Sequence, residues 1–160
     1  MIPQRAIDAW REFAPWIENS QIEQDLVISR ALIEIYSDPF LKEVFAFRGG
    51  TALQKLFFDE PTRYSEDIDL VQTSQAPMGK SIDALRKRLD PWLGEPQRSV
   101  KRERTTLSYR FTTEIEPVRA MRLKVEINTS EHFSFAPLQR KKLKCKIFGL
   151  ADQLMCRRMN

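Results

Sequence analysis

The chain has 160 residues, of which 42% are hydrophobic and 30% charged, and its formal net charge is +4. This balance excludes a disordered or fibrous protein, and the length predicts one domain with a buried core. No apolar run reaches the roughly 18 residues of a membrane span, the first residues lack the apolar segment of a signal peptide, and two cysteines are too few for a disulfide scaffold, so we expect a cytoplasmic protein.

Residues 1–44 are predicted to form a helical part of this domain. Apolar side chains recur at helical spacing over residues 6–13, and Pro15 should end this short helix. The sequence SQIE at 20–23 has the form of a capping box, whose Ser and Glu side chains satisfy free N–H groups at the start of a helix. A second, longer helix should therefore begin there and run on a wide apolar face to residues 37–39.

Residues 45–150 are predicted to form the core of the domain. In chain order we expect a strand at 45–48, a helix after Gly50, a strand at 67–71, a helix at 82–89 that ends at Pro91, two strands at 107–111 and 121–127, and a weaker strand at 141–148. The strands at 107–111 and 121–127 should pair antiparallel. This order predicts an α/β (α+β) protein with a mixed β-sheet that helices flank on one side.

Two short motifs in this core indicate phosphate and metal chemistry. Gly49 and Gly50 open a helix, where residues without Cβ let backbone N–H groups approach a phosphate. Asp67 and Asp69 alternate with apolar residues, so their strand should bury one face and direct both carboxylates to the other. Paired carboxylates bind divalent cations, and phosphate with metal suggests a nucleotide. Ordinary turns are the alternative for both motifs.

The strand at 121–128 supplies two more candidate residues. Lys124 and Glu126 alternate with the apolar residues of this strand and should share its polar face. If the strand lies beside that of Asp67 and Asp69, Glu126 adds a third carboxylate to the metal site and Lys124 lies near the phosphoryl charge. The alternative is a solvated strand on which Lys124 and Glu126 form a weak surface pair.

The stretch FRGGTALQKLFFDEPTRYSEDIDL resembles the signature of the AbiEii/AbiGii toxin family. That family is a branch of the DNA polymerase β-like nucleotidyltransferase superfamily and occurs in bacterial toxin–antitoxin and abortive-infection systems. The resemblance extends from about the first helix to residues 122–128, and RYSEDIDL is its most specific part. It implies the nucleotidyltransferase fold, transfer of a nucleoside monophosphate from an NTP to an RNA or protein hydroxyl, Mg²⁺ or Mn²⁺ as cofactor, and a cognate antitoxin. A tRNA or another RNA is one acceptor that fits.

The same stretch contains three further nucleotide-binding candidates. Thr51 is placed so that its hydroxyl and N–H reach the triphosphate, or it caps the helix without a ligand. Ser65 either binds phosphate or holds its loop, and Arg63 pairs with phosphate or with a core carboxylate. Lys55, in contrast, is predicted to face solvent.

The C-terminal part departs from the family pattern. Members of the family continue into a helical region with a lysine and a later aspartate, whereas this sequence ends at Asn160 with Arg157 near the lysine position. Residues 150–159 are predicted to form an uncapped helix that continues in a longer chain. With that region missing, the alternative to an enzyme is a non-catalytic nucleotide- or RNA-binding module, truncated or decayed. The basic run at 140–146 is either an RNA-binding stripe or an edge strand that lysines protect from aggregation.

Overall fold

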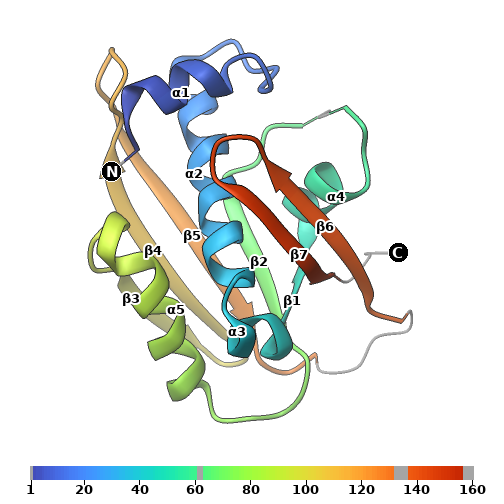
Figure 1. The fold of residues 1–160 in the computed structure, drawn as a ribbon. Helices are drawn as coiled ribbons and strands as arrows, with labels where there is room; N and C mark the ends of the chain where they lie inside the picture. Colours follow the sequence, from blue (N-terminus) through green and yellow to red (C-terminus); the bar gives the residue numbers. More distant parts are fainter. Residues whose placement is uncertain (1, 61–62, 132–136, 157–160) are drawn as a thin grey trace.

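The computed structural model describes residues 2–60, 63–131 and 137–156; most of its helices come early in the chain and most of its strands late (Figure 1). The elements are α1 (Gln4–Trp10), α2 (Asn19–Tyr36), α3 (Pro39–Val44), β1 (Phe45–Arg48), α4 (Gly49–Leu56), β2 (Asp67–Gln72), α5 (Met78–Leu93), β3 (Gln97–Lys101), β4 (Arg104–Thr112), β5 (Ala120–Asn128), β6 (Gln139–Cys145) and β7 (Gly149–Cys156). The predicted mixed sheet with flanking helices is confirmed. None of the described helices is long and apolar enough to cross a membrane.

The described strands form one seven-stranded sheet in the order β3-β4-β5-β2-β1-β7-β6. β2 pairs parallel with β5 and antiparallel with β1, and β1 pairs parallel with β7, whereas the other neighbours are antiparallel. The antiparallel pair predicted for 107–111 and 121–127 is therefore confirmed as β4 and β5. β2 lies between β5 and β1, which confirms that the strand of Asp67 and Asp69 is next to that of Glu126.

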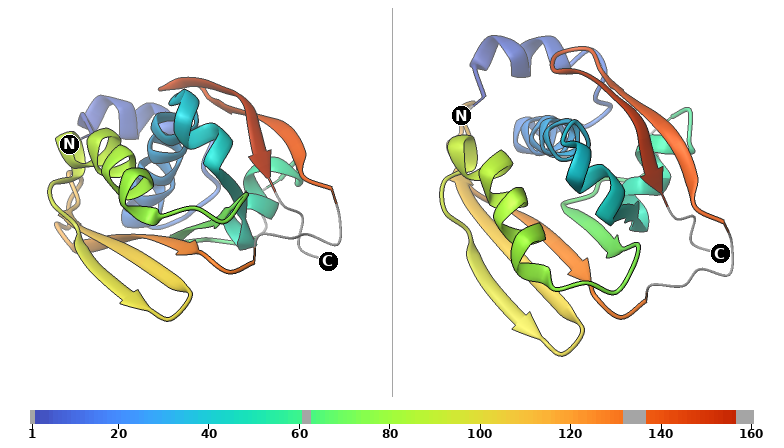
Figure 2. Two further views of the ribbon diagram at one scale, coloured as in Figure 1. Left: turned by 90° about the horizontal axis from the view of Figure 1, so that it is seen from below. Right: turned by 60° about the horizontal axis from the view of Figure 1, so that its bottom comes forward.

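The long helix α2 packs in the middle of the molecule. Figure 2 shows α2 and α5 on one side of the β3–β4–β5 part of the sheet, while the β6–β7 hairpin turns up beside α2, so that the sheet wraps round this helix. Leu26, Ile28 and Leu32 are fully buried in the resulting core. One turn of the same helix also buries three polar residues in a row, Glu23, Gln24 and Asp25.

The start of α2 differs from the predicted capping box. The helix begins at Asn19, and the residue before it, Glu18, makes no capping bond with its side chain. Glu23 instead accepts hydrogen bonds from the backbone N–H groups of Glu114 and Ile115, in the connection between β4 and β5. A tertiary contact has thus replaced the local one that the sequence suggested.

Several other boundaries differ from the sequence-based prediction. The short helix α3 was not predicted, although Asp38 caps it by accepting from the N–H groups of Phe40 and Leu41 and Pro39 opens it. The exposed strand β3 was also missed, because its residues show no apolar alternation. Pro91 lies inside α5, which ends only at Leu93, with Gly94 as its C-cap. Pro91 has no N–H to donate to the carbonyl four residues before it, but the buried Leu93 and the hydrogen bond from the N–H of Gly94 to the carbonyl of Asp90 hold the last turn.

The helix predicted for residues 150–159 is wrong. Residues Gly149–Cys156 form β7, which pairs antiparallel with β6, and Cys156 lies opposite Phe47 of β1. The free side of β1 and the tight β6–β7 hairpin supply backbone partners for an extended chain, and these tertiary hydrogen bonds override a helical local preference. Arg157 and the rest of residues 157–160 lie outside the described residues.

Candidate active site

Four of the predicted site residues lie on two paired strands. In the parallel pair of β2 with β5, Asp67 is opposite Lys124 and Asp69 is opposite Glu126. The side chains between them are buried in the core, whereas all four of these residues are half-buried. The four side chains therefore share the sheet face that the alternation predicted.

The two aspartates lie in an environment that disfavours their charge. Burial raises the pKa of Asp69, and the neighbouring charges of Glu126 and Asp67 raise it further, while Arg48 and Arg104 oppose the effect. Burial likewise raises the pKa of Asp67, which Lys124 partly offsets. A group of carboxylates held under mutual repulsion is stabilised by a bound cation.

The donor atoms suit a hard divalent cation, but the third carboxylate is engaged elsewhere. Within residues 2–60, 63–131 and 137–156, no three His, Cys, Asp or Glu side chains form a ready metal site. The Oε2 atom of Glu126 accepts from Nη1 of Arg104 at 3.4 Å. Asp67 and Asp69 supply the oxygen ligands that Mg²⁺ and Mn²⁺ prefer. They fit the role of metal ligands, and Glu126 lies on the same sheet face with one of its two carboxylate oxygens paired to Arg104.

The two glycines at the start of α4 face different surroundings. Gly49 has a φ of +85°, and a Cβ at this position would collide with the carboxylate of Asp69. Gly50 has an ordinary backbone conformation, and a Cβ there would have no heavy atom within 4 Å. Gly49 thus lets Asp69 lie against the first turn of α4, whereas Gly50 leaves an open surface at the helix N-terminus, where a phosphate can approach the backbone.

The remaining candidates from the family-like stretch are placed less uniformly. Thr51 is 1% exposed, and its hydroxyl donates to the backbone carbonyl of Asp67 at 2.6 Å and also contacts the hydroxyl of Ser65. In this geometry the Thr51 hydroxyl ties α4 to β2, which favours the alternative of a threonine without a ligand. Arg63 is exposed on the loop before β2 and has no ion pair with another described residue.

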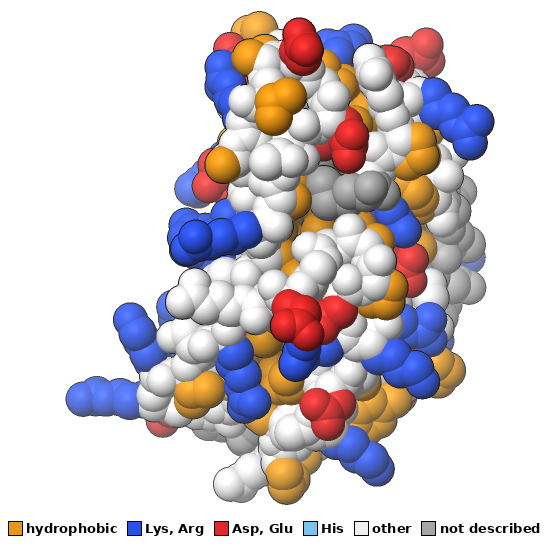
Figure 3. Space-filling model, turned by 90° about the vertical axis from the view of Figure 1, so that its left-hand side faces the viewer, with side chains coloured by type: hydrophobic (Ala, Val, Ile, Leu, Met, Phe, Trp, Pro, Cys, Tyr) orange, Lys and Arg blue, Asp and Glu red, His pale blue; other side chains and the backbone are white. Residues whose placement is uncertain are grey.

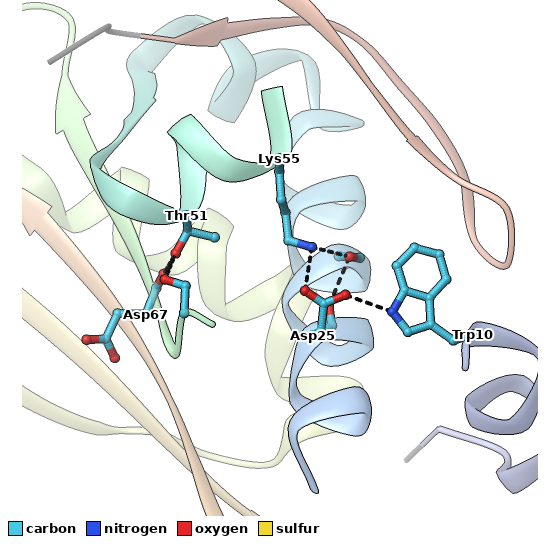
Figure 4. A network of polar contacts seen from close by, with 7 residues as sticks. Trp10, Asp25, Thr51, Lys55 and Asp67 are labelled. Carbon is cyan, nitrogen blue, oxygen red and sulfur yellow. Dashed lines mark hydrogen bonds and ion pairs between the residues drawn. The ribbon is translucent and has the colours of Figure 1, made fainter. Parts of the chain in front are cut away.

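Lys55 was predicted to face solvent, and this prediction is wrong. Its side chain is 10% exposed, and Nζ donates to Oδ1 of Asp25 and to the hydroxyl of Ser29, both at 2.9 Å (Figure 4). The other carboxylate oxygen of Asp25 accepts from Nε1 of Trp10 at 2.8 Å. The sequence did hold a signal. Asp25 interrupts the apolar face of α2 beside Ile22 and Leu26, and a buried carboxylate needs a partner.

A basic groove opens on the same face of the sheet as the carboxylates. It has a volume of about 350 Å³ and is lined by Ser99, Lys101, Arg104, Thr106, Arg122, Lys124 and Glu126. Glu126 therefore belongs both to the groove and to the carboxylate site. In Figure 3, which looks at the side of the molecule where β3 and β4 lie, Lys and Arg side chains gather over the left and lower parts of the surface. Sequence reasoning missed this groove because its cations come from three strands.

Several side chains of the basic run at 140–146 are engaged by other residues of the protein. β6 is the edge strand of the sheet, and a register shift between Lys141 and Leu143 interrupts its alternation. Arg140 pairs with Glu43, Lys141 lies over the ring of Phe57, and Lys146 lies over that of Phe13. These contacts favour the interpretation of a protected edge strand.

Comparison with known proteins identifies the family of the chain. The family model of the nucleotidyl transferase AbiEii toxin, from type IV toxin–antitoxin systems, matches residues 30–156. The chain therefore belongs to the AbiEii family of nucleotidyltransferase toxins, as its resemblance implied. No curated protein sequence matches the chain.

Solved structures show the same fold. The nucleotidyltransferase toxin MenT4 from Mycobacterium tuberculosis H37Rv is 17% identical, with a TM-score of 0.60, over 98% of this chain and 55% of that protein. JHP933 from Helicobacter pylori is 14% identical, with a TM-score of 0.52, over 78% of this chain and 50% of that protein. The chain thus spans about half the length of these two proteins.

Proposed function

We propose that the protein is a metal-dependent nucleotidyltransferase toxin that transfers a nucleoside monophosphate from an NTP to a hydroxyl group of an RNA. The main support is the pairing of β2 with β5, which brings Asp67, Asp69 and Glu126 to one sheet face. Gly49, directly against Asp69, brings the N-terminus of α4 to the same place. Carboxylates beside a helix N-terminus suit a metal-bound triphosphate.

In this proposal each candidate residue has its own role in the transfer. Asp67 and Asp69 hold Mg²⁺ or Mn²⁺, and Gly50 presents the start of α4 to the triphosphate, with Ser65 and the exposed Arg63 on the adjoining loop as further phosphate contacts. The cation, when bound, neutralises phosphate charge and favours ionisation of the attacking hydroxyl. Glu126 orients that hydroxyl and accepts its proton, while Lys124 stabilises charge that develops on the phosphoryl group. A new bond forms between the acceptor oxygen and the α-phosphorus, and pyrophosphate leaves.

The basic groove favours an RNA over a protein acceptor. The sheet order places α4 on the β1 side of β2 and the groove on the β5 side, so donor and acceptor can reach the carboxylates from opposite sides. Lys101, Arg104 and Arg122 offer a row of cations to a phosphodiester backbone. Membership of a type IV toxin–antitoxin family also supports a cognate antitoxin as a partner.

Nucleotide binding that depends on a divalent cation is the first expected result. Calorimetric titration with each NTP should give binding in Mg²⁺ or Mn²⁺ and none in EDTA, because the carboxylates repel an uncompensated triphosphate. Incubation of labelled NTP with total RNA and with total protein should then label the RNA. Binding without transfer would support the non-catalytic module, and equal affinity in EDTA would contradict the metal-bridged site.

The groove predicts a salt-dependent contribution to RNA affinity. The double variant Lys101→Gln/Arg122→Gln should weaken RNA binding for all sequences alike and lower the slope of log K against log salt by about 1 for each lost phosphate contact. Filter binding over a range of salt concentrations measures both effects. Lys87→Gln, on the exposed face of α5 across the sheet, is the matched control and should change neither. An unchanged slope in the double variant would remove the groove from the RNA site.

A further inference from the structure

Gln24 of α2 joins the two strands that hold the candidate carboxylates. Its side chain is 1% exposed, and Nε2 donates to the backbone carbonyls of Glu66 and Arg122, each at 3.1 Å. Glu66 immediately precedes Asp67, and Arg122 lies two residues before Lys124. One side-chain amide therefore fixes the beginning of β2 against β5, on the strand segments from which the site is built.

Asp25, the next residue of α2, joins the same helix to α4. Its ion pair with Lys55 is buried, and Lys55 follows Thr51 by one helical turn, so both side chains extend from one face of α4 (Figure 4). Thr51 in turn donates to the carbonyl of Asp67. These contacts form a closed circuit that runs from α2 through Lys55 to α4, through Thr51 to β2, and through Gln24 back to α2.

Stability alone does not explain these buried polar groups. A buried ion pair contributes little to the stability of a fold compared with apolar side chains of similar volume, because both charges lose their hydration. Oε1 of Gln24 also has no hydrogen-bond partner within the described part of the chain, which is a further cost. These polar groups instead fix the relative positions of the elements that carry the site. Each contact fixes one site-bearing element at a defined place relative to another.

We propose that Gln24, Asp25 and Lys55 are positioning residues, which set the N-terminus of α4 with Gly49 and Gly50 relative to Asp67 and Asp69. The mechanical coupling stands on these contacts, whereas its effect on nucleotide binding rests on the proposed function. None of the three residues needs to touch the nucleotide, because a small displacement between phosphate-binding and metal-binding groups suffices to impair binding.

The test compares Lys55→Met on α4 with a control variant on α2, the helix that the Lys55 ion pair reaches. Glu23→Gln alters a fully buried polar residue of α2, but one that binds the β4–β5 connection instead of the site. In calorimetry with NTP and Mg²⁺, Lys55→Met should bind NTP at least about tenfold more weakly than the wild type. Glu23→Gln should change the affinity less than about twofold. Lys55→Arg, which keeps the positive charge, should recover most of the loss. Equal losses in Lys55→Met and Glu23→Gln would overturn the proposal.

Amide hydrogen exchange separates this inference from the proposed function. Lys55→Met should speed exchange of residues 67–70 in β2, although the substitution lies on α4, whereas Glu23→Gln should do so only around residues 113–116. If the wild-type chain binds no NTP, the proposed function fails while these exchange rates still decide the coupling. Unchanged exchange in β2 would refute it. If Lys55→Met does not fold, Asp25→Asn, which keeps the acceptor for Trp10, takes its place in both experiments.

Discussion

Replacing Asp69 with asparagine should abolish nucleotidyl transfer and at the same time stabilise the metal-free protein. Transfer should fall by about 10²- to 10³-fold or more, because a proposed ligand of the cation that neutralises phosphate charge is lost. The stability gain follows from the raised pKa of Asp69, which reflects burial and the charges of Glu126 and Asp67. Asparagine has nearly the same shape and removes that unfavourable charge.

The pH dependence of this gain has a definite sign. Because the pKa of Asp69 is higher in the folded than in the unfolded state, the folded protein binds the proton more tightly. The wild-type chain therefore has its full stability from this group below the unfolded pKa and loses it as the pH rises through the folded pKa. The melting temperature of Asp69→Asn in EDTA should exceed that of the wild type at pH 7, and the difference should vanish towards pH 4.

Mg²⁺ should reverse the order of stability. The cation binds the folded wild type through Asp67 and Asp69 and should raise its melting temperature, while Asp69→Asn should gain little. Asp83→Asn, the same chemical change at an exposed position of α5, is the control and should leave transfer and melting temperature near their wild-type values. A destabilised Asp69→Asn at pH 7 in EDTA would show that the carboxylate is held by favourable contacts, contrary to a strained site.

Alanine at Gly49 and at Gly50 should change stability in opposite directions. Gly49→Ala places a side chain at a φ of +85° and against the Asp69 carboxylate, so it should destabilise the fold by about 2 kcal/mol or more. Gly50→Ala meets no atom within 4 Å, and alanine favours a helix, so it should stabilise by about 0.5 kcal/mol. Chemical denaturation measures both values.

The affinity for NTP should also distinguish the roles of the two glycines. The methyl group of Gly50→Ala lies on the open surface where a phosphate is proposed to approach α4, so this variant should bind NTP more weakly in spite of its greater stability. Calorimetry in Mg²⁺ gives the affinities. A stable Gly50→Ala variant with unchanged affinity would move the triphosphate away from the start of α4.

The sheet face of the candidate site could be predicted because strand parity is a strong local signal. Alternation in β2 and β5 placed Asp67, Asp69, Lys124 and Glu126 opposite the apolar residues, and a one-residue shift would have buried Glu126. The adjacency of these strands did not follow from alternation. It needed the family resemblance, since the two strands pair across a long stretch of sequence.

The errors concern residues whose partners lie far away in the chain. Lys55 looks like a surface residue of a short helix until α2 brings Asp25 against it, and Glu23 looks like part of a cap until the β4–β5 connection supplies its N–H donors. The hydroxyl of Thr51 likewise finds its acceptor on β2. β7 was mistaken for a helix because its partners, β1 and β6, are not visible in its own sequence.

The position of β2 in the sheet also constrains when the three candidate carboxylates can come together in a nascent chain. β3, β4 and β5 are consecutive in the chain and form antiparallel pairs, contacts of the kind that form early, whereas β2 must wait for β5 to close a long loop. During synthesis the carboxylates of Asp67 and Asp69 leave the ribosome well before Glu126. A ribosome-bound fragment that ends before β5 thus carries two of the three candidate carboxylates but lacks the strand that holds the third.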